Sequence, residues 1–110
     1  MRYIENAVEI GTVDGVTGVF FGPADIGADM GLLGNPAHPA IWDLIRPAAD
    51  KLIAAGVPVG TLVSDPAFAA DLLAKGFTFV ACGSDAGLLA RGADNLLATV
   101  RKTLTEGKEL

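Results

Sequence analysis

Cysteine is almost absent from this sequence, since Cys82 is the only one among 110 residues. A single thiol excludes a disulfide within the chain and a zinc site built from several cysteines. Cys82 ends an apolar run that is typical of a buried strand, so we expect it to behave as a small, inert hydrophobic side chain.

Basic residues are also scarce, with 8 Lys and Arg against 13 Asp and Glu and a formal net charge of −5. No cluster of Lys or Arg could neutralise a phosphate backbone, which excludes nucleic acid as a partner. Charged residues, Gly or Pro interrupt every apolar run before it reaches the length of a membrane span, and no signal-peptide pattern opens the chain. We therefore expect a soluble, cytoplasmic protein that does not bind membranes.

Apolar residues, in contrast, make up 51% of the chain and charged residues only 19%. The length predicts a single domain over residues 1–110. So few charges would cover an isolated globule poorly, and exposed apolar patches usually mark interfaces. The composition thus predicts a homo-oligomer, or a chain that needs a complementing half.

Three short apolar runs, residues 18–21, 57–63 and 77–82, are typical of buried strands. Longer stretches with helical spacing lie between and after them, at residues 41–55, 66–75 and 88–104, and Tyr3–Ile10 is a further helical stretch that runs on to a turn at Asp14-Gly15. Strands that alternate with helices predict an α/β fold with a parallel sheet, about three strands and four helices in all. Three strands cannot close a barrel.

The expected helix ends follow from capping residues. Asp65 followed by Pro66 predicts a helix start, Gly76 predicts the end of that helix, and Pro39 is a suitable first residue for the helix before it. Pro47 falls inside the 41–55 pattern, where it should kink or split the helix.

Parallel α/β proteins bind ligands at the carboxyl ends of their strands. That rule selects residues 22–29, 63–65 and 83–85, each with a carboxylate. In the first loop, Asp25 offers a hard oxygen ligand for Mg²⁺ or Mn²⁺, and the alternative is that it caps the following short helix. Asp29 is expected on a solvated face.

For the remaining polar candidates, the sequence favours structural roles over catalytic ones. Asp65 is expected to be a helix cap, and Ser84-Asp85 is either a cap or an anion site at a helix start. His38 lies in a turn-rich segment where a surface or capping role is favoured over acid–base chemistry. Trp42 is expected in the core or at an interface, and no dinucleotide, phosphate-loop or serine-nucleophile motif is present.

The segment Asp14-Gly15-Val16-Thr17-Gly18-Val19-Phe20-Phe21-Gly22-Pro23-Ala24-Asp25-Ile26-Gly27 resembles the metal-binding strand and loop of the HpcH/HpaI aldolase/citrate lyase family. Further similarity follows at residues 34–39, 54–56, 76–85 and 88–92. The resemblance implies a (β/α)₈ TIM barrel that makes or breaks a carbon–carbon bond between pyruvate and an aldehyde. A divalent metal, Mg²⁺, Mn²⁺ or Co²⁺, stabilises the pyruvate enolate in such enzymes.

Carried across, the resemblance makes Asp25 a metal ligand, Ala24 a backbone contact of the pyruvate carboxylate, and Leu62 a residue of the aldehyde pocket. The family's metal-binding glutamate would fall just before Met1, and its base histidine and pyruvate-binding arginine have no counterpart here. His38 does not match that histidine. The resemblance thus implies a C-terminal part of a barrel, without catalytic residues and inactive alone.

Two other functions remain open. A non-catalytic α/β module that self-associates would also explain the apolar composition. A small flavodoxin-like binding domain is the weaker alternative, because that fold has more strands.

Overall fold

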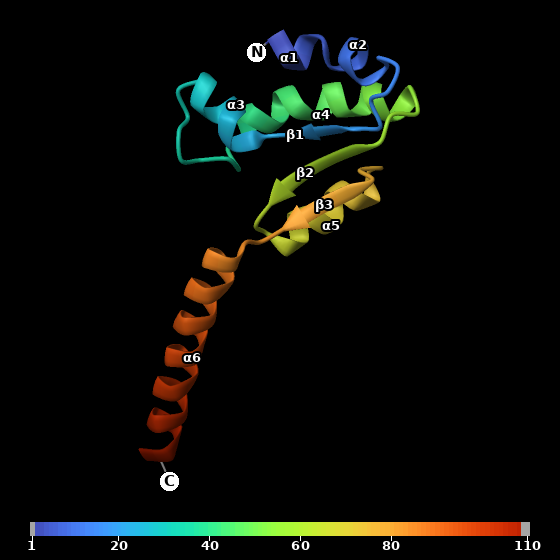
Figure 1. The fold of residues 1–110 in the computed structure, drawn as a ribbon. Coiled ribbons are helices and arrows are strands. Elements are labelled where there is room, and N and C mark those ends of the chain that lie inside the picture. The colour runs from blue at the N-terminus through green and yellow to red at the C-terminus, as the bar shows by residue number, and fades with distance from the viewer. Residues whose placement is uncertain (1, 109–110) are drawn as a thin grey trace.

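The computed structural model describes residues 2–108 and shows an α/β fold with three parallel strands, which confirms the predicted fold class (Figure 1). In chain order, the elements are α1 (Arg2–Glu5), α2 (Ala7–Gly11), β1 (Val19–Phe21), α3 (Pro23–Asp29), α4 (Pro39–Ala54), β2 (Val59–Val63), α5 (Pro66–Ala74), β3 (Phe79–Cys82) and α6 (Asp85–Lys108). No helix within residues 2–108 is long and apolar enough to cross a membrane.

The described residues form six helices instead of the expected four. The N-terminal stretch is two short helices that meet at Asn6 and end at Gly11, so the prediction of one helical stretch running on to Asp14-Gly15 was wrong, although the turn at Asp14-Gly15 is present. The loop after β1 coils into α3. Pro47 lies inside α4 without splitting it, because α4 is continuous from Pro39 to Ala54.

The sheet has the order β1-β2-β3, with β2 in the centre. Phe21 pairs with Thr61, and Thr61 pairs with Val80, so the three strands run side by side in one direction. Side chains alternate between the two faces of a strand. Phe21, Val59 and Thr61 therefore share the buried face, where the apolar side of α4 packs.

The opposite face of the sheet is covered by no helix of the described chain. Phe20, Leu62 and Phe79 belong to this uncovered face by register, and each is close to half exposed, at 51%, 49% and 45%. The Phe20 and Phe79 rings lie 5.5 Å apart, on either side of Gly60. This face is the one that points into the lumen when such a sheet closes into a barrel.

Strand β3 is an edge strand and is more exposed than its apolar sequence predicts. Cys82 is exposed, so its predicted burial was wrong. Whether the side chains of β3 are buried depends on whether another element packs on this face and this edge of the sheet. The local sequence does not contain that information.

Helix α6 leaves the end of β3 and runs away from the rest of the molecule (Figure 1). Its predicted amphipathic pattern is present, but the apolar side chains, Leu88, Leu89, Leu96, Leu97, Val100 and Leu104, are all exposed. In this structure α6 therefore adds nothing to the hydrophobic core.

Gly60 provides the first testable prediction, because a Cβ at this position would overlap the Phe79 ring. We expect Gly60→Ala to displace that ring from Phe20 and to lower the free energy of unfolding by about 1–3 kcal/mol, the usual cost of overpacking. Gly92→Ala is the matched control, since nothing lies within 4 Å of its Cβ position in α6. Urea unfolding followed by Trp42 fluorescence measures both, and equal midpoints for the two variants would contradict the packing argument.

Asp71 on α5 provides a second prediction. Its carboxylate lies 3.1 Å from Lys75 Nζ and 3.2 Å from Arg46 Nη2 of α4. The hydrogen bond from Lys75, and then the one from Arg46, hold the pKa of Asp71 below its ordinary value of 3.8. A lowered carboxylate pKa adds stability above the ordinary pKa, and that contribution is lost as the pH falls through the folded-state pKa.

Asp71→Asn should therefore lower the unfolding midpoint slightly at neutral pH, and the difference from the wild type should shrink as the pH falls below 3.8, the ordinary pKa of the carboxyl group. The side chains of Asp71, Arg46 and Lys75 are all partly exposed to solvent, so added salt should also reduce the difference in midpoint. Urea unfolding at several pH values measures this, and a difference that persists at low pH would show that the ion pair is not its cause.

Candidate functional site

The loops that follow β1, β2 and β3 all lie at one edge of the sheet, because the three strands are parallel. This is the carboxyl edge at which the sequence predicts a ligand site. Each of the three loops contains a carboxylate. The carboxylates after β2 and β3 accept hydrogen bonds at helix starts, whereas Asp25, after β1, does not.

Asp25 is the third residue of α3, in the loop region after β1. Gly22 is the N-cap, and no side chain caps this helix, so the alternative that Asp25 is the capping residue was wrong. The Asp25 carboxylate is exposed and makes no hydrogen bond or ion pair with another described residue. Its Oδ2 lies over Gly22, 3.3 Å from the position that a Cβ would occupy there. Asp25 is thus an available hard ligand at the strand end.

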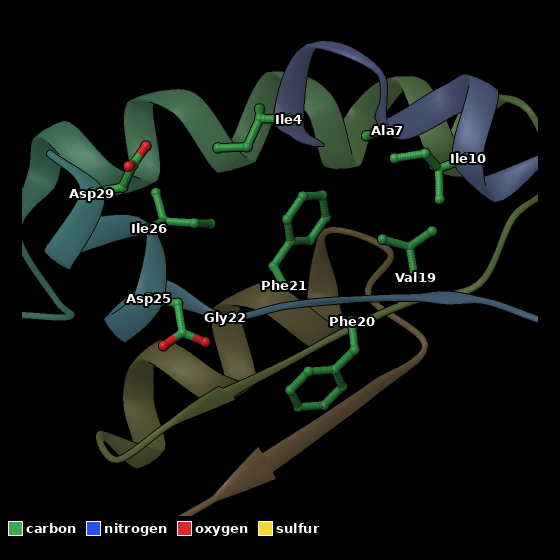
Figure 2. A pocket seen from close by; sticks show the side chains of 10 residues that line it. All are labelled: Ile4, Ala7, Ile10, Val19, Phe20, Phe21, Gly22, Asp25, Ile26 and Asp29. Carbon is green, nitrogen blue, oxygen red and sulfur yellow. The ribbon is translucent and has the colours of Figure 1, made fainter. Parts of the chain in front are cut away.

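A cavity of about 520 Å³ lies along the outer edge of β1, beneath α1 and α2 (Figure 2). Its walls are mostly apolar, with Phe21 pointing from β1 toward the helices and Ile4 and Ile26 facing the same space. Asp25 and Asp29 are the two carboxylates among its lining residues. The edge of β1 beside the cavity pairs with no other strand of the described chain.

Ala24 and Leu62, the two predicted substrate contacts, are exposed but lie apart from that cavity wall. Ala24 is in the first turn of α3, next to Asp25. Leu62 is on the uncovered face of the sheet. The structure therefore places Ala24 beside the predicted metal ligand, while Leu62 lies on the neighbouring strand.

The other polar candidates cap helices, as their structural interpretation predicts. Asp65 Oδ1 accepts a hydrogen bond from the Ala67 amide at 3.2 Å, and His38 Nδ1 accepts one from the Ala40 amide at 3.1 Å. At the start of α6, Ser84 Oγ accepts from the Gly87 amide at 3.1 Å and Asp85 Oδ1 accepts from the Ala86 amide at 2.8 Å.

The described residues do not offer a divalent metal a full set of side-chain ligands. Within residues 2–108 no three His, Cys, Asp or Glu side chains come together in a way that could hold an ion. Mg²⁺ usually keeps several waters and binds through one or two carboxylates together with substrate oxygens. Asp25 suits such an ion as one ligand, and within residues 2–108 no cluster of His, Cys, Asp or Glu side chains joins it.

Two features of the site were not found from the sequence. The cavity is one, because Ile4 of α1 and Ile26 of α3 come from separate helices and line one space only after the chain has folded. Thr61 is the other: it is fully buried and its Oγ1 donates a hydrogen bond of 3.0 Å to the Phe21 carbonyl, 40 residues away. A threonine inside an apolar strand is a signal that could have identified it, since a buried hydroxyl needs a partner.

Known proteins resemble this chain over nearly its whole length. The chain is 50% identical over 87 residues to a hydroxypyruvate/pyruvate aldolase of Paraburkholderia phytofirmans, which is 79% of this chain and 33% of that protein. It is 48% identical over 95 residues to a 4-hydroxy-2-oxo-heptane-1,7-dioate aldolase of Salmonella arizonae, covering 86% of this chain and 36% of that protein. The chain therefore spans about a third of the length of these relatives.

The fold is shared with a solved protein as well. The crystal structure of an HpcH/HpaI aldolase/citrate lyase family protein from Burkholderia cenocepacia matches with a TM-score of 0.82 at 30% identity, over 91% of this chain and 39% of that one. This agrees with the predicted partial (β/α)₈ barrel. The sequence profile described as HpcH/HpaI aldolase/citrate lyase matches residues 2–92. The chain belongs to the HpcH/HpaI aldolase/citrate lyase family.

Proposed function

We propose that this chain forms part of a divalent-metal-dependent aldolase that cleaves 4-hydroxy-2-oxo acids to pyruvate and an aldehyde. The observation that carries the proposal is the Asp25 carboxylate, which is exposed at the carboxyl edge of β1 and without a partner among the described residues. The names of the relatives, a hydroxypyruvate/pyruvate aldolase and a 4-hydroxy-2-oxo-heptane-1,7-dioate aldolase, support the reaction class.

In this proposal Asp25 is one ligand of a Mg²⁺, Mn²⁺ or Co²⁺ ion, and the Ala24 backbone and the Leu62 side chain contact the substrate. The other ligands, the base and the group that binds the pyruvate carboxylate come from a complementing part of the barrel. The open edge of β1 and the cavity beside it support this division, because a further parallel strand could pair there. The chain alone is inactive.

A chimaera tests the proposal directly. The part of this chain that matches the Paraburkholderia phytofirmans aldolase, at 50% identity over 87 residues, replaces its counterpart in that enzyme. We expect the chimaera to release pyruvate from a 4-hydroxy-2-oxo acid in the presence of Mn²⁺, and the 110-residue chain to release none. A folded chimaera without activity, or an active isolated chain, would contradict the proposal.

A second function, a non-catalytic module that self-associates, is favoured by α6, whose apolar side chains are exposed from Leu88 to Leu104. Exposed apolar surface of this kind usually marks an interface. Light scattering on the purified chain separates the two functions. A stable dimer or larger oligomer of defined size favours the module. A chain that is monomeric at low concentration, and that aggregates at high concentration unless a complementing barrel half is present, favours the aldolase part.

A further inference from the structure

Thr61 is the single polar residue that lies fully buried among residues 4–107. It is in the middle of β2, directly across from Phe21, the last residue of β1. Its Oγ1 donates a hydrogen bond to the Phe21 carbonyl oxygen at 3.0 Å. The bond therefore links the two strands at the point where β1 ends and the chain turns toward Asp25.

No side chain caps the turn that follows Phe21. Helices α4, α5 and α6 each begin with a side chain that accepts a hydrogen bond from a backbone amide, whereas α3 begins at Gly22 with none. Asp25 folds back over Gly22, so the place of its carboxylate depends on how Gly22 leaves the strand. The Phe21 carbonyl and the Gly22 amide belong to one planar peptide group, so the orientation of the carbonyl and the direction in which Gly22 leaves the strand are fixed together.

We propose that Thr61 is a positioning residue, which fixes the Phe21 end of β1 so that the Gly22 turn presents the Asp25 carboxylate at the sheet edge. This inference rests on the proposed role of Asp25 as a metal ligand. Thr61 itself is buried and contacts no metal or substrate. It acts through the Phe21 carbonyl, and valine, which has the same shape without the hydroxyl, should fill the space and lose the effect.

A different result is expected if Thr61 only stabilises the fold and does not position Asp25. Loss of the hydroxyl would then destabilise the whole chain and affect all elements equally. Two amides distinguish the roles. Ile26 donates to the Gly22 carbonyl at 3.0 Å and reports on the first turn of α3, and Ala69 donates to the Asp65 carbonyl at 3.0 Å and reports on α5.

The experiment is amide hydrogen exchange on the 110-residue chain and its Thr61→Val and Thr61→Ser variants, observed by nuclear magnetic resonance. We expect Thr61→Val to speed exchange at Ile26 about fivefold more than at Ala69, the factor that corresponds to one net hydrogen bond. Thr61→Ser keeps the hydroxyl and should restore the wild-type ratio. Equal acceleration at both amides, an unchanged Ile26, or a serine variant that behaves like valine would overturn the inference.

A second readout uses Mn²⁺ alone, whose paramagnetism broadens the amide signals near a weakly bound ion. In the wild-type chain, broadening at Gly22 and Ala24 should saturate at millimolar Mn²⁺ and should disappear in Asp25→Asn. Thr61→Val should require about fivefold more Mn²⁺, in line with the exchange result. Wild-type broadening that does not depend on Asp25 would refute the ligand role of Asp25, whereas an Asp25-dependent signal that Thr61→Val leaves unchanged would refute the positioning role alone.

If Thr61→Val prevents folding, Thr61→Cys takes its place, because a thiol is of similar size and a much weaker donor. The same ratio between Ile26 and Ala69 then decides the question.

Discussion

Asp25→Asn in the chimaera is expected to lower aldol cleavage more than about 100-fold, since even groups that only support metal ligands account for 10–100-fold in affinity or activity. Asparagine has the shape of aspartate but no charge, so it keeps the fold of α3 and loses the anionic oxygen that a hard cation prefers. The expected loss is greatest at low Mn²⁺ and is partly recovered at high Mn²⁺. Initial rates of pyruvate release across a Mn²⁺ titration measure it.

Asp65→Asn is the matched control for this substitution. Asp65 follows β2 at the same edge of the sheet, but its Oδ1 accepts from the Ala67 amide and caps α5. Asparagine caps helices about as well as aspartate, so activity and stability should both stay near the wild-type values. An Asp25→Asn chimaera that is as active as the Asp65→Asn chimaera would remove the ground for calling Asp25 a ligand.

Leu52→Ala is the substitution with the largest expected effect on stability. Leu52 is fully buried on the side of α4 that packs in the core. Truncation of a buried leucine costs about 2–5 kcal/mol, from lost transfer free energy and the cavity that remains. A small domain has only about 5–15 kcal/mol to lose. Urea unfolding of the 110-residue chain, followed by Trp42 fluorescence, should show a large fall in the midpoint.

Leu89→Ala applies the same change on α6, where the side chain is 76% exposed. Alanine is the better helix former, and nothing is uncovered, so the free energy of unfolding should change by less than about 0.5 kcal/mol. A loss at Leu89 comparable to that at Leu52 would show that α6 is packed against a partner in solution. That result would favour the self-associating module.

The sequence predicts best those features that depend on a few neighbouring residues. Local chemistry predicts the three strands, the helix caps at His38 and Asp65, and the end of α5 before Gly76. Gly76 has the left-handed backbone, at φ +107°, that favours such a helix end. The helical interpretation of residues 3–10 failed at Asn6, where the chain changes direction to lie on α4. That change is imposed by packing between distant segments.

Burial was harder to predict than secondary structure, as Cys82 and α6 show. An apolar run indicates that a segment is suited to burial, and it does not indicate whether a covering element is present. Phe79 and Leu88 have the composition of core residues and are exposed here. The same limit applies to Leu62, whose predicted place in an aldehyde pocket depends on what faces the uncovered side of the sheet.

The candidate site also contains one residue that the local sequence identifies and one that only the fold reveals. The strand end and the motif around it identify Asp25 from the sequence, and the structure places its carboxylate at the sheet edge without a capping role. Thr61 was missed, because its partner, the Phe21 carbonyl, is 40 residues away and becomes a neighbour only when β1 and β2 pair.

The most direct test of the central claim, that this chain provides one ligand of a metal site completed by another part of a barrel, is isothermal titration with Mn²⁺ in the presence of pyruvate. We expect tight binding by the chimaera, loss of that binding in its Asp25→Asn variant, and only weak binding by the 110-residue chain alone. Tight binding of Mn²⁺ and pyruvate by the isolated chain would contradict this claim.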